Sequence, residues 1–99
     1  ITAFGGTPLR GGWLQHMSYW VYILWSNKLR RHYVGSTSDL EKRIKYHNYG
    51  KSLYTKRGIP WELVYKESSL TKQTAWKREM EIKKYKGGVQ FKKLIHGEV

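Results

Sequence analysis

The chain has 99 residues, enough for one small domain, and it carries a formal net charge of +12 at pH 7. It contains no cysteine, which excludes thiol nucleophiles and zinc fingers and fits a reducing, cytoplasmic location. No stretch reaches the ~18 apolar residues of a membrane span, so no membrane partner is expected. Five Trp and eight Tyr among the basic residues predict a folded domain that binds a polyanion, with nucleic acid as the leading candidate. A ribosome-associated or merely basic protein is the alternative.

The first sixteen residues differ in character from the rest. They are rich in Gly, carry one charge and show neither helical nor strand periodicity, and they end at His16-Met17, which has the form of a cloning junction before a start methionine. We interpret residues 1–16 as the remnant of an expression tag and residues 17–99 as the domain. A native flexible arm is the alternative.

Three segments have the composition of β-strands. Residues 19–25 and 31–35 are rich in aromatic and β-branched side chains and flank a polar turn, which predicts a hairpin over 19–35. Alternation assigns the first strand's side chains to two faces, one with Tyr19, Val21, Ile23 and Trp25, the other with Trp20, Tyr22 and Leu24. A third strand is predicted over 61–67, with one side formed by Trp61, Leu63 and Tyr65.

Helices are predicted between and after these strands. Ser38 and Glu41 have the spacing of a capping box and predict a helix to about Tyr49, where Gly50 can close it. Thr71 is expected to cap a second helix over 72–86, and a short third helix is expected over 89–96. The order β-β-α-β-α-α predicts an α+β fold.

The first helix carries two polar side chains on one face. Leu40, Arg43, Ile44 and His47 follow at i, i+3, i+4 and i+7, so they should all point inward. An inward Arg43 suits a phosphate, because its guanidinium offers paired donors and stays charged. His47 could orient a hydroxyl group or move a proton near neutral pH. A satisfied core histidine is the alternative.

Glu79 is the acid that stands out, because it shares a stripe of the second helix with Ala75 and Ile82. One carboxylate suits a single Mg²⁺ (or Mn²⁺) that keeps several waters and binds a substrate phosphate. An ion pair with Lys83 at i+4 is the alternative. Asp39 and Glu41 are expected as acids of a first helical turn. The other acids are expected to be solvated, namely Glu62, Glu67, Glu81 and Glu98.

Basic residues gather in two places. Residues 50–60 form a basic loop, and the later helices add more cations. We expect phosphate contacts from Lys51, Lys56, Arg57, Lys83 and Lys84, and from Lys86, Lys92 and Lys93. Gly-x-Ser-x-Gly and Gly-x-x-x-x-Gly-Lys motifs are absent from the sequence, so neither serine hydrolysis nor a nucleotide cofactor is expected.

Two tyrosine tripeptides begin the candidate site, Val21-Tyr22-Ile23 and Tyr33-Val34-Gly35. Each tyrosine alone would be an ordinary half-buried sheet residue. Gly35 changes this, because it lets the backbone or a phosphate approach closely. The candidate catalytic set, which could hydrolyse a phosphodiester, is Tyr22, Tyr33, Arg43, His47 and Glu79.

In this order the residues resemble the GIY-YIG nuclease superfamily, above all its small stand-alone bacterial members. The two tripeptides stand where the family has Gly-Ile-Tyr and Tyr-Ile-Gly, Arg43 and His47 match its Arg-x3-His, and Glu79 matches its metal-binding glutamate. The segment Tyr54-Thr55-Lys56-Arg57 also resembles the stand-alone branch. The likeness covers about residues 19–96 and implies a three-stranded, mostly antiparallel sheet flanked by helices.

The resemblance also implies an activity, the Mg²⁺-dependent hydrolysis of DNA by an endonuclease. The expected role is structure-specific cutting of DNA during repair or recombination. Tyr22 would orient or deprotonate the attacking water, aided by His47 or the metal because a free phenol has a pKa of about 10. Tyr33 would hydrogen-bond the phosphate or the water, Arg43 would stabilise the phosphoryl oxygens, and Glu79 would hold the ion.

Two other interpretations remain open. One is a nucleic-acid-binding module with the nuclease scaffold and little or no cleavage. The other is a cutting domain that a separate targeting protein brings to its DNA.

Overall fold

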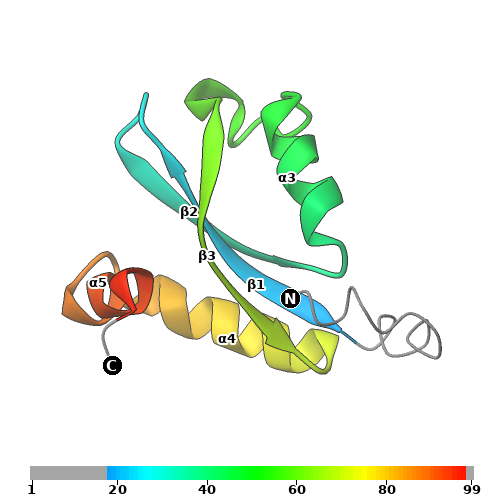
Figure 1. The fold of residues 1–99 in the computed structure, drawn as a ribbon, viewed down its shortest axis with the longest axis vertical. Helices are drawn as coiled ribbons and strands as arrows, with labels where there is room; N and C mark the ends of the chain where they lie inside the picture. The colour runs from blue at the N-terminus through cyan, green and yellow to red at the C-terminus, as the bar shows by residue number, and fades with distance from the viewer. Residues whose placement is uncertain (1–17, 98–99) are drawn as a thin grey trace.

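The computed structural model describes residues 18–97, so the predicted tag remnant at residues 1–16 lies outside the described residues. Within residues 18–97 there are three strands and three α-helices in the predicted order (Figure 1). A short 3-10 turn, η1 (Lys56–Gly58), precedes the third strand. The elements are β1 (Tyr19–Ser26), β2 (Arg31–Thr37), α3 (Leu40–Asn48), β3 (Trp61–Ser69), α4 (Lys72–Lys84) and α5 (Val89–His96). In this part of the chain every helix is too short or too polar to span a bilayer.

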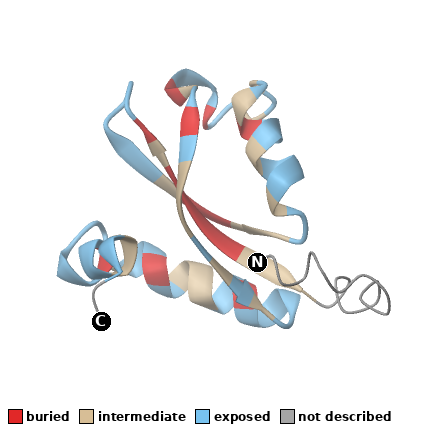
Figure 2. Cartoon of the chain, in the orientation of Figure 1, coloured by how far each residue is buried: buried red, intermediate tan, exposed pale blue. Residues whose placement is uncertain are grey.

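The strands form one antiparallel sheet in the order β2-β1-β3, which confirms the predicted α+β class. β1 is the central strand, and its run of consecutive buried residues, whose side chains alternate between the faces, shows that both faces are covered (Figure 2). α3 packs against one face of the sheet, and α4 and α5 pack against the other. β2 is an edge strand, so side chains on the two faces of the sheet can approach each other around its free edge.

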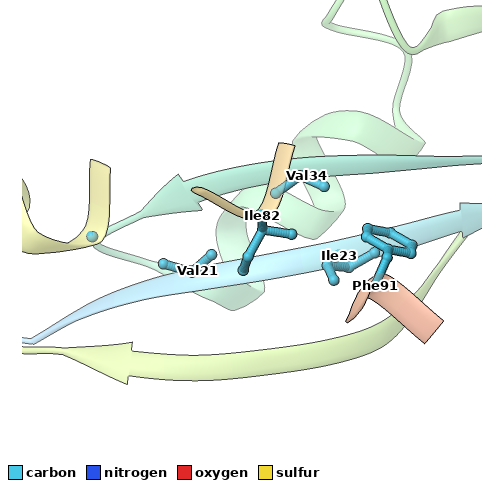
Figure 3. Close-up of a cluster of buried hydrophobic side chains, with 6 residues drawn as sticks. Val21, Ile23, Val34, Ile82 and Phe91 are labelled. Carbon is cyan, nitrogen blue, oxygen red and sulfur yellow. The ribbon is translucent and has the colours of Figure 1, made fainter. Parts of the chain in front are cut away.

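Two apolar clusters lie on opposite faces of β1, as the alternation predicted. On the α4 and α5 face, Val21 and Ile23 pack with Ile82 and Phe91 (Figure 3). On the α3 face, Leu24 belongs to a second buried cluster. Leu40 and Ile44 of α3 pack against this second cluster. Each fully buried aliphatic or aromatic side chain contributes roughly 1.5–3 kcal/mol, so both clusters hold the sheet between its helices.

Trp61, Leu63 and Tyr65 were predicted to share one side of β3, and this is wrong for Tyr65. Leu24 pairs with Leu63 but Ile23 pairs with Tyr65, so Val64 is an extra residue that forms a β-bulge. The bulge shifts the alternation of side chains by one position. Trp61 and Leu63 consequently face α3, whereas Val64 and Tyr65 pack against the opposite cluster.

The helix caps agree with the sequence-based prediction at some positions and differ at one. Asp39, rather than Ser38, is the N-cap of α3, and its side chain accepts a hydrogen bond from the Lys42 amide at 3.1 Å. Asp caps helices as well as Ser does, so the sequence alone does not distinguish the two. Gly50 follows α3 with φ of +77°, and Thr71 caps α4, as predicted.

Glu67 is not the solvated acid that was expected. Its side chain is half-buried and accepts hydrogen bonds from the Tyr65 hydroxyl and from Arg78 Nε, the latter at 2.8 Å. This contact ties β3 to α4 on the face opposite α3.

Candidate active site

The first part of the site is the pairing of β1 with β2, which sets Tyr22 opposite Gly35. A Cβ atom added to Gly35 would lie 2.6 Å from the Tyr22 hydroxyl oxygen and 2.7 Å from ring carbon Cζ. Only glycine therefore fits beside this ring. The sequence predicted a close approach at Gly35, and the approaching group is the Tyr22 phenol.

A buried polar chain runs from Tyr22 into the α3 side of the fold. The Tyr22 hydroxyl lies 3.0 Å from His47 Nε2, and His47 Nδ1 lies 2.8 Å from Thr55 Oγ1. All three side chains are at most 2% exposed. The Thr55 carbonyl accepts a hydrogen bond from Trp61 Nε1 at 2.7 Å, which fixes the end of the chain. Thr55 was not among the predicted site residues, although it lies in the segment 54–57 that carried part of the resemblance.

Burial sets the protonation states in this chain. Burial raises the pKa of Tyr22 above its ordinary 10, the Tyr33 phenol raises it further, and the charge of Arg43 opposes the rise. Burial also lowers the pKa of His47 below 6.5, and Arg43 adds to this. At neutral pH Tyr22 thus keeps its proton and His47 is a neutral imidazole. In the tautomer whose Nδ1–H donates to Thr55, Nε2 is free to accept the Tyr22 proton.

Arg43 differs from its predicted inward position. Leu40, Ile44 and His47 face the sheet, but Arg43 lies at the edge of this face and is exposed. Its guanidinium carbon lies 5.0 Å from the centre of the Tyr46 ring. A long side chain can keep its charged end in water in this way while remaining near a buried site.

Tyr33 connects the buried chain to the surface. Its half-buried ring lies 4.9 Å from the His47 ring and 5.9 Å from the Tyr54 ring, centre to centre. Tyr54 is 84% exposed. Burial raises the pKa of Tyr33, the charge of Lys83 opposes this, and the charge of Glu79 adds to it.

Glu79 lies beside β2 on the α4 face of the sheet, opposite to the face that carries Tyr22 and His47. Ser36 donates a hydrogen bond to Glu79 Oε1 at 2.7 Å, and Lys83 Nζ lies 2.7 Å from Oε2. Neighbouring strand residues point to opposite faces, so Gly35 lies toward α3 and Ser36 toward α4. The ion pair with Lys83, which was the alternative interpretation of Glu79, is therefore present. The Ser36 contact, 43 residues distant in sequence, was not predicted.

The surroundings of Glu79 decide whether it could hold a metal. No group of three His, Cys, Asp or Glu side chains within residues 18–97 is placed to bind an ion. An ion here would have Glu79 as its carboxylate ligand and would complete its shell with waters and substrate oxygens. Mg²⁺ is commonly bound in this way, so the oxygen donor that is present fits the predicted ion.

The predicted DNA-binding cations fall into two groups. Lys51, Lys56 and Arg57 are exposed around Thr55, on the side of His47, and Lys83 is beside Glu79. Lys84 is exposed but lines a separate depression on α4 with Trp76 and Met80. The structure therefore leaves three exposed cations in the segment that carries Thr55, puts Lys83 in contact with Glu79, and leaves Lys84 apart.

Comparison with known proteins gives one consistent result. The model of the GIY-YIG catalytic domain, a nuclease domain, matches residues 18–92. A UPF0213 protein of Staphylococcus epidermidis is 44% identical over 66 residues, which are 66% of this chain and 80% of the relative. One from Staphylococcus haemolyticus is 43% identical over 68 residues, 68% of this chain and 82% of the relative.

Among solved structures, the solution structure of UPF0213 protein BH0048 from Bacillus halodurans is 36% identical. The match covers 69% of this chain and 72% of that chain, with a TM-score of 0.43. The family match spans both tyrosine tripeptides, α3 and α4, and so confirms the resemblance inferred from the sequence. The chain belongs to the GIY-YIG family.

Proposed function

We propose that this chain is a divalent-metal-dependent endonuclease that hydrolyses DNA phosphodiester bonds. The observation that carries the proposal is the buried hydrogen-bonded series Tyr22–His47–Thr55, whose Tyr22 end lies beside Gly35 of the edge strand β2, while Glu79 contacts Ser36 of the same strand. A pure DNA-binding module needs surface cations. It has no need of a neutral imidazole that is hydrogen-bonded to a protonated phenol in the core.

Tyr22 and His47 would act together on the attacking water. The water would pass a proton to the Tyr22 oxygen as Tyr22 passes its own proton to His47 Nε2, and the new hydroxide oxygen would bond to phosphorus. The P–O bond to the leaving oxygen then breaks, and that oxygen takes a proton from solvent water. The imidazolium is stabilised by its Nδ1–H donating to Thr55 Oγ1, and it returns its proton through Tyr22 to solvent after the reaction. This relay suits the raised pKa of Tyr22, because no free phenolate has to exist before the reaction.

The other residues would handle the phosphate. Arg43 at the edge of α3 would offer paired donors to phosphoryl oxygens, and Tyr33 would hydrogen-bond the phosphate or the water. Glu79 would hold Mg²⁺ or Mn²⁺, which supplies positive charge for the phosphoryl group when bound. Lys51, Lys56 and Arg57 would contact the DNA backbone beside the cut.

We also propose that residues 17–99 form the nuclease domain, which acts on DNA in the cytoplasm during repair or recombination. The panel that tests the activity consists of labelled branched, nicked, single-stranded and duplex DNAs, each incubated with Mg²⁺, Mn²⁺ or EDTA. We expect metal-dependent cleavage of at least one DNA and none in EDTA. Tight binding of every DNA without any cleavage would instead support the binding-module interpretation.

A further inference from the structure

The carboxylate of Glu79 already has a cation in contact with it. Lys83 lies one helical turn further along α4, with its Nζ 2.7 Å from Oε2, while Ser36 occupies Oε1. The Glu79 side chain is only 12% exposed, so water screens this pair less than a surface pair. A divalent ion at Oε2 would meet the ammonium at close range, where like charges repel strongly. An ion that binds at Oε2 would therefore displace Lys83.

Lys83 has room to move and a second partner to move to. Its side chain is 45% exposed, and a lysine has a flexible four-carbon stem. Its charge also acts on the Tyr33 phenol, so the ammonium lies within electrostatic range of the other half of the site. A DNA phosphate held beside Tyr33 would offer an anionic oxygen to replace the carboxylate.

We propose that Lys83 is an internal counter-cation, which holds Glu79 in the metal-free protein and moves to a DNA phosphate when the ion takes its place. This inference rests on the proposed function. The exchange keeps every charge near Glu79 paired in both states. It also couples the two ligands, so DNA should strengthen metal binding and metal should strengthen DNA binding by the same factor. Lys83 is then a positioning residue for cleavage.

The test is Mn²⁺ binding, measured without DNA by the electron paramagnetic resonance signal of the free ion. Lys83→Met should bind Mn²⁺ roughly fivefold more tightly than the wild type, because a partly exposed ion pair contributes up to about that factor. Lys84→Met removes the same charge from the next residue and should stay within about twofold of the wild type. Lys83→Arg keeps the charge and should bind Mn²⁺ as weakly as the wild type.

A second arm uses Tyr22→Phe protein, which should leave the DNA largely intact. DNA should increase the Mn²⁺ affinity of this variant, and the increase should shrink when Lys83→Met is added. Equal Mn²⁺ affinities of Lys83→Met and Lys84→Met would overturn the role of Lys83 and leave the nuclease proposal standing. Wild-type Mn²⁺ affinity in Glu79→Gln would instead remove the metal ligand on which the proposed function depends.

Discussion

Among single residues, Tyr22 carries the hydroxyl whose removal should be most informative. Tyr22→Phe keeps the buried ring and removes only the hydroxyl that contacts His47. We expect the cleavage rate to fall at least ~100-fold with little change in DNA affinity, as expected when a proton-transfer group is removed. Tyr65→Phe is the matched control, because Tyr65 packs on the opposite face against Glu67. Near-normal cutting by Tyr22→Phe would rule out the relay.

His47 should act in the same relay and not independently. His47→Ala alone should slow cleavage, and the double variant with Tyr22→Phe should be about as slow as the slower single variant. Single-turnover rates of the four proteins measure this. Rate reductions that multiply in the double variant would mean that the two residues act in separate steps.

The buried imidazole also predicts how stability depends on pH. Burial lowers the pKa of His47 below 6.5, so the unfolded chain binds the proton more readily than the folded chain. The stability that neutral His47 provides is therefore present above pH 6.5 and is lost as the pH falls through the lower pKa of the folded state. His32 has a lowered pKa from burial too, so it should contribute in the same direction.

Urea unfolding between about pH 7.5 and about pH 5 checks this prediction. The free energy of unfolding of the wild type should decrease over this range. The decrease should be smaller in His47→Gln, and the remainder should respond to His32→Gln. If the free energy of unfolding depended on pH identically in wild type and His47→Gln, His47 would have the same pKa in the folded and the unfolded chain.

Some site residues could be identified from the sequence, and others could not, for a physical reason. Tyr22, His47 and Glu79 could be predicted as candidates because their order and spacing in the chain match the pattern of the GIY-YIG family, although each residue alone is uninformative. Thr55 and Ser36 are ordinary loop and strand residues whose roles depend on partners brought close by folding. The exposure of Arg43 was not predicted because periodicity indicates the direction of a Cβ atom and not the path of a long side chain.

Among the structural elements, the segment between α3 and β3 carries residues of both proposed roles, proton transfer and DNA binding. It carries Thr55, which contacts His47, and the exposed cations Lys51, Lys56 and Arg57. Changing these three cations to Ala should weaken DNA binding. It should also reduce the dependence of log affinity on log salt by up to roughly 0.9 for each duplex phosphate that the protein no longer neutralises.

Fluorescence anisotropy over a range of salt concentrations measures this dependence. A matched control changes three exposed lysines outside the predicted DNA-binding set to Ala, namely Lys28, Lys72 and Lys77. The affinity of the control should fall less than that of the loop variant. Equal reductions in DNA affinity would mean that binding depends on the total charge of the protein and not on the cations of this loop.

Element order and type followed from the sequence, whereas pairing details did not. The strands, the helices and the Thr71 cap were predictable from local composition and spacing. The bulge at Val64 arises from the register between β1 and β3, which depends on how both faces pack. Asp39 was not predicted as a cap because Ser38 and Asp39 are adjacent residues with equal capping ability.

In the molecule as a whole, the edge strand β2 is what unites the site. The tyrosine–histidine chain lies on the α3 face and Glu79 lies on the α4 face, and the absence of a side chain at Gly35 lets the Tyr22 phenol pack closely against this strand. The three-layer arrangement therefore brings a proton-accepting group and a carboxylate to the two sides of one narrow edge. We infer that these two halves serve a single hydrolytic reaction.

A comparison of Glu79→Gln with Glu81→Gln in Mg²⁺-dependent cleavage of the best DNA substrate tests this inference. Both changes remove one charge from α4, but Glu81 is exposed and contacts Arg78 and Tyr85 away from β2. We predict that Glu79→Gln abolishes cleavage while keeping DNA binding, and that Glu81→Gln cuts like the wild type. Cleavage by Glu79→Gln at the wild-type rate would show that the two halves do not share a reaction, because Glu79 would then be only the ion-pair partner of Lys83.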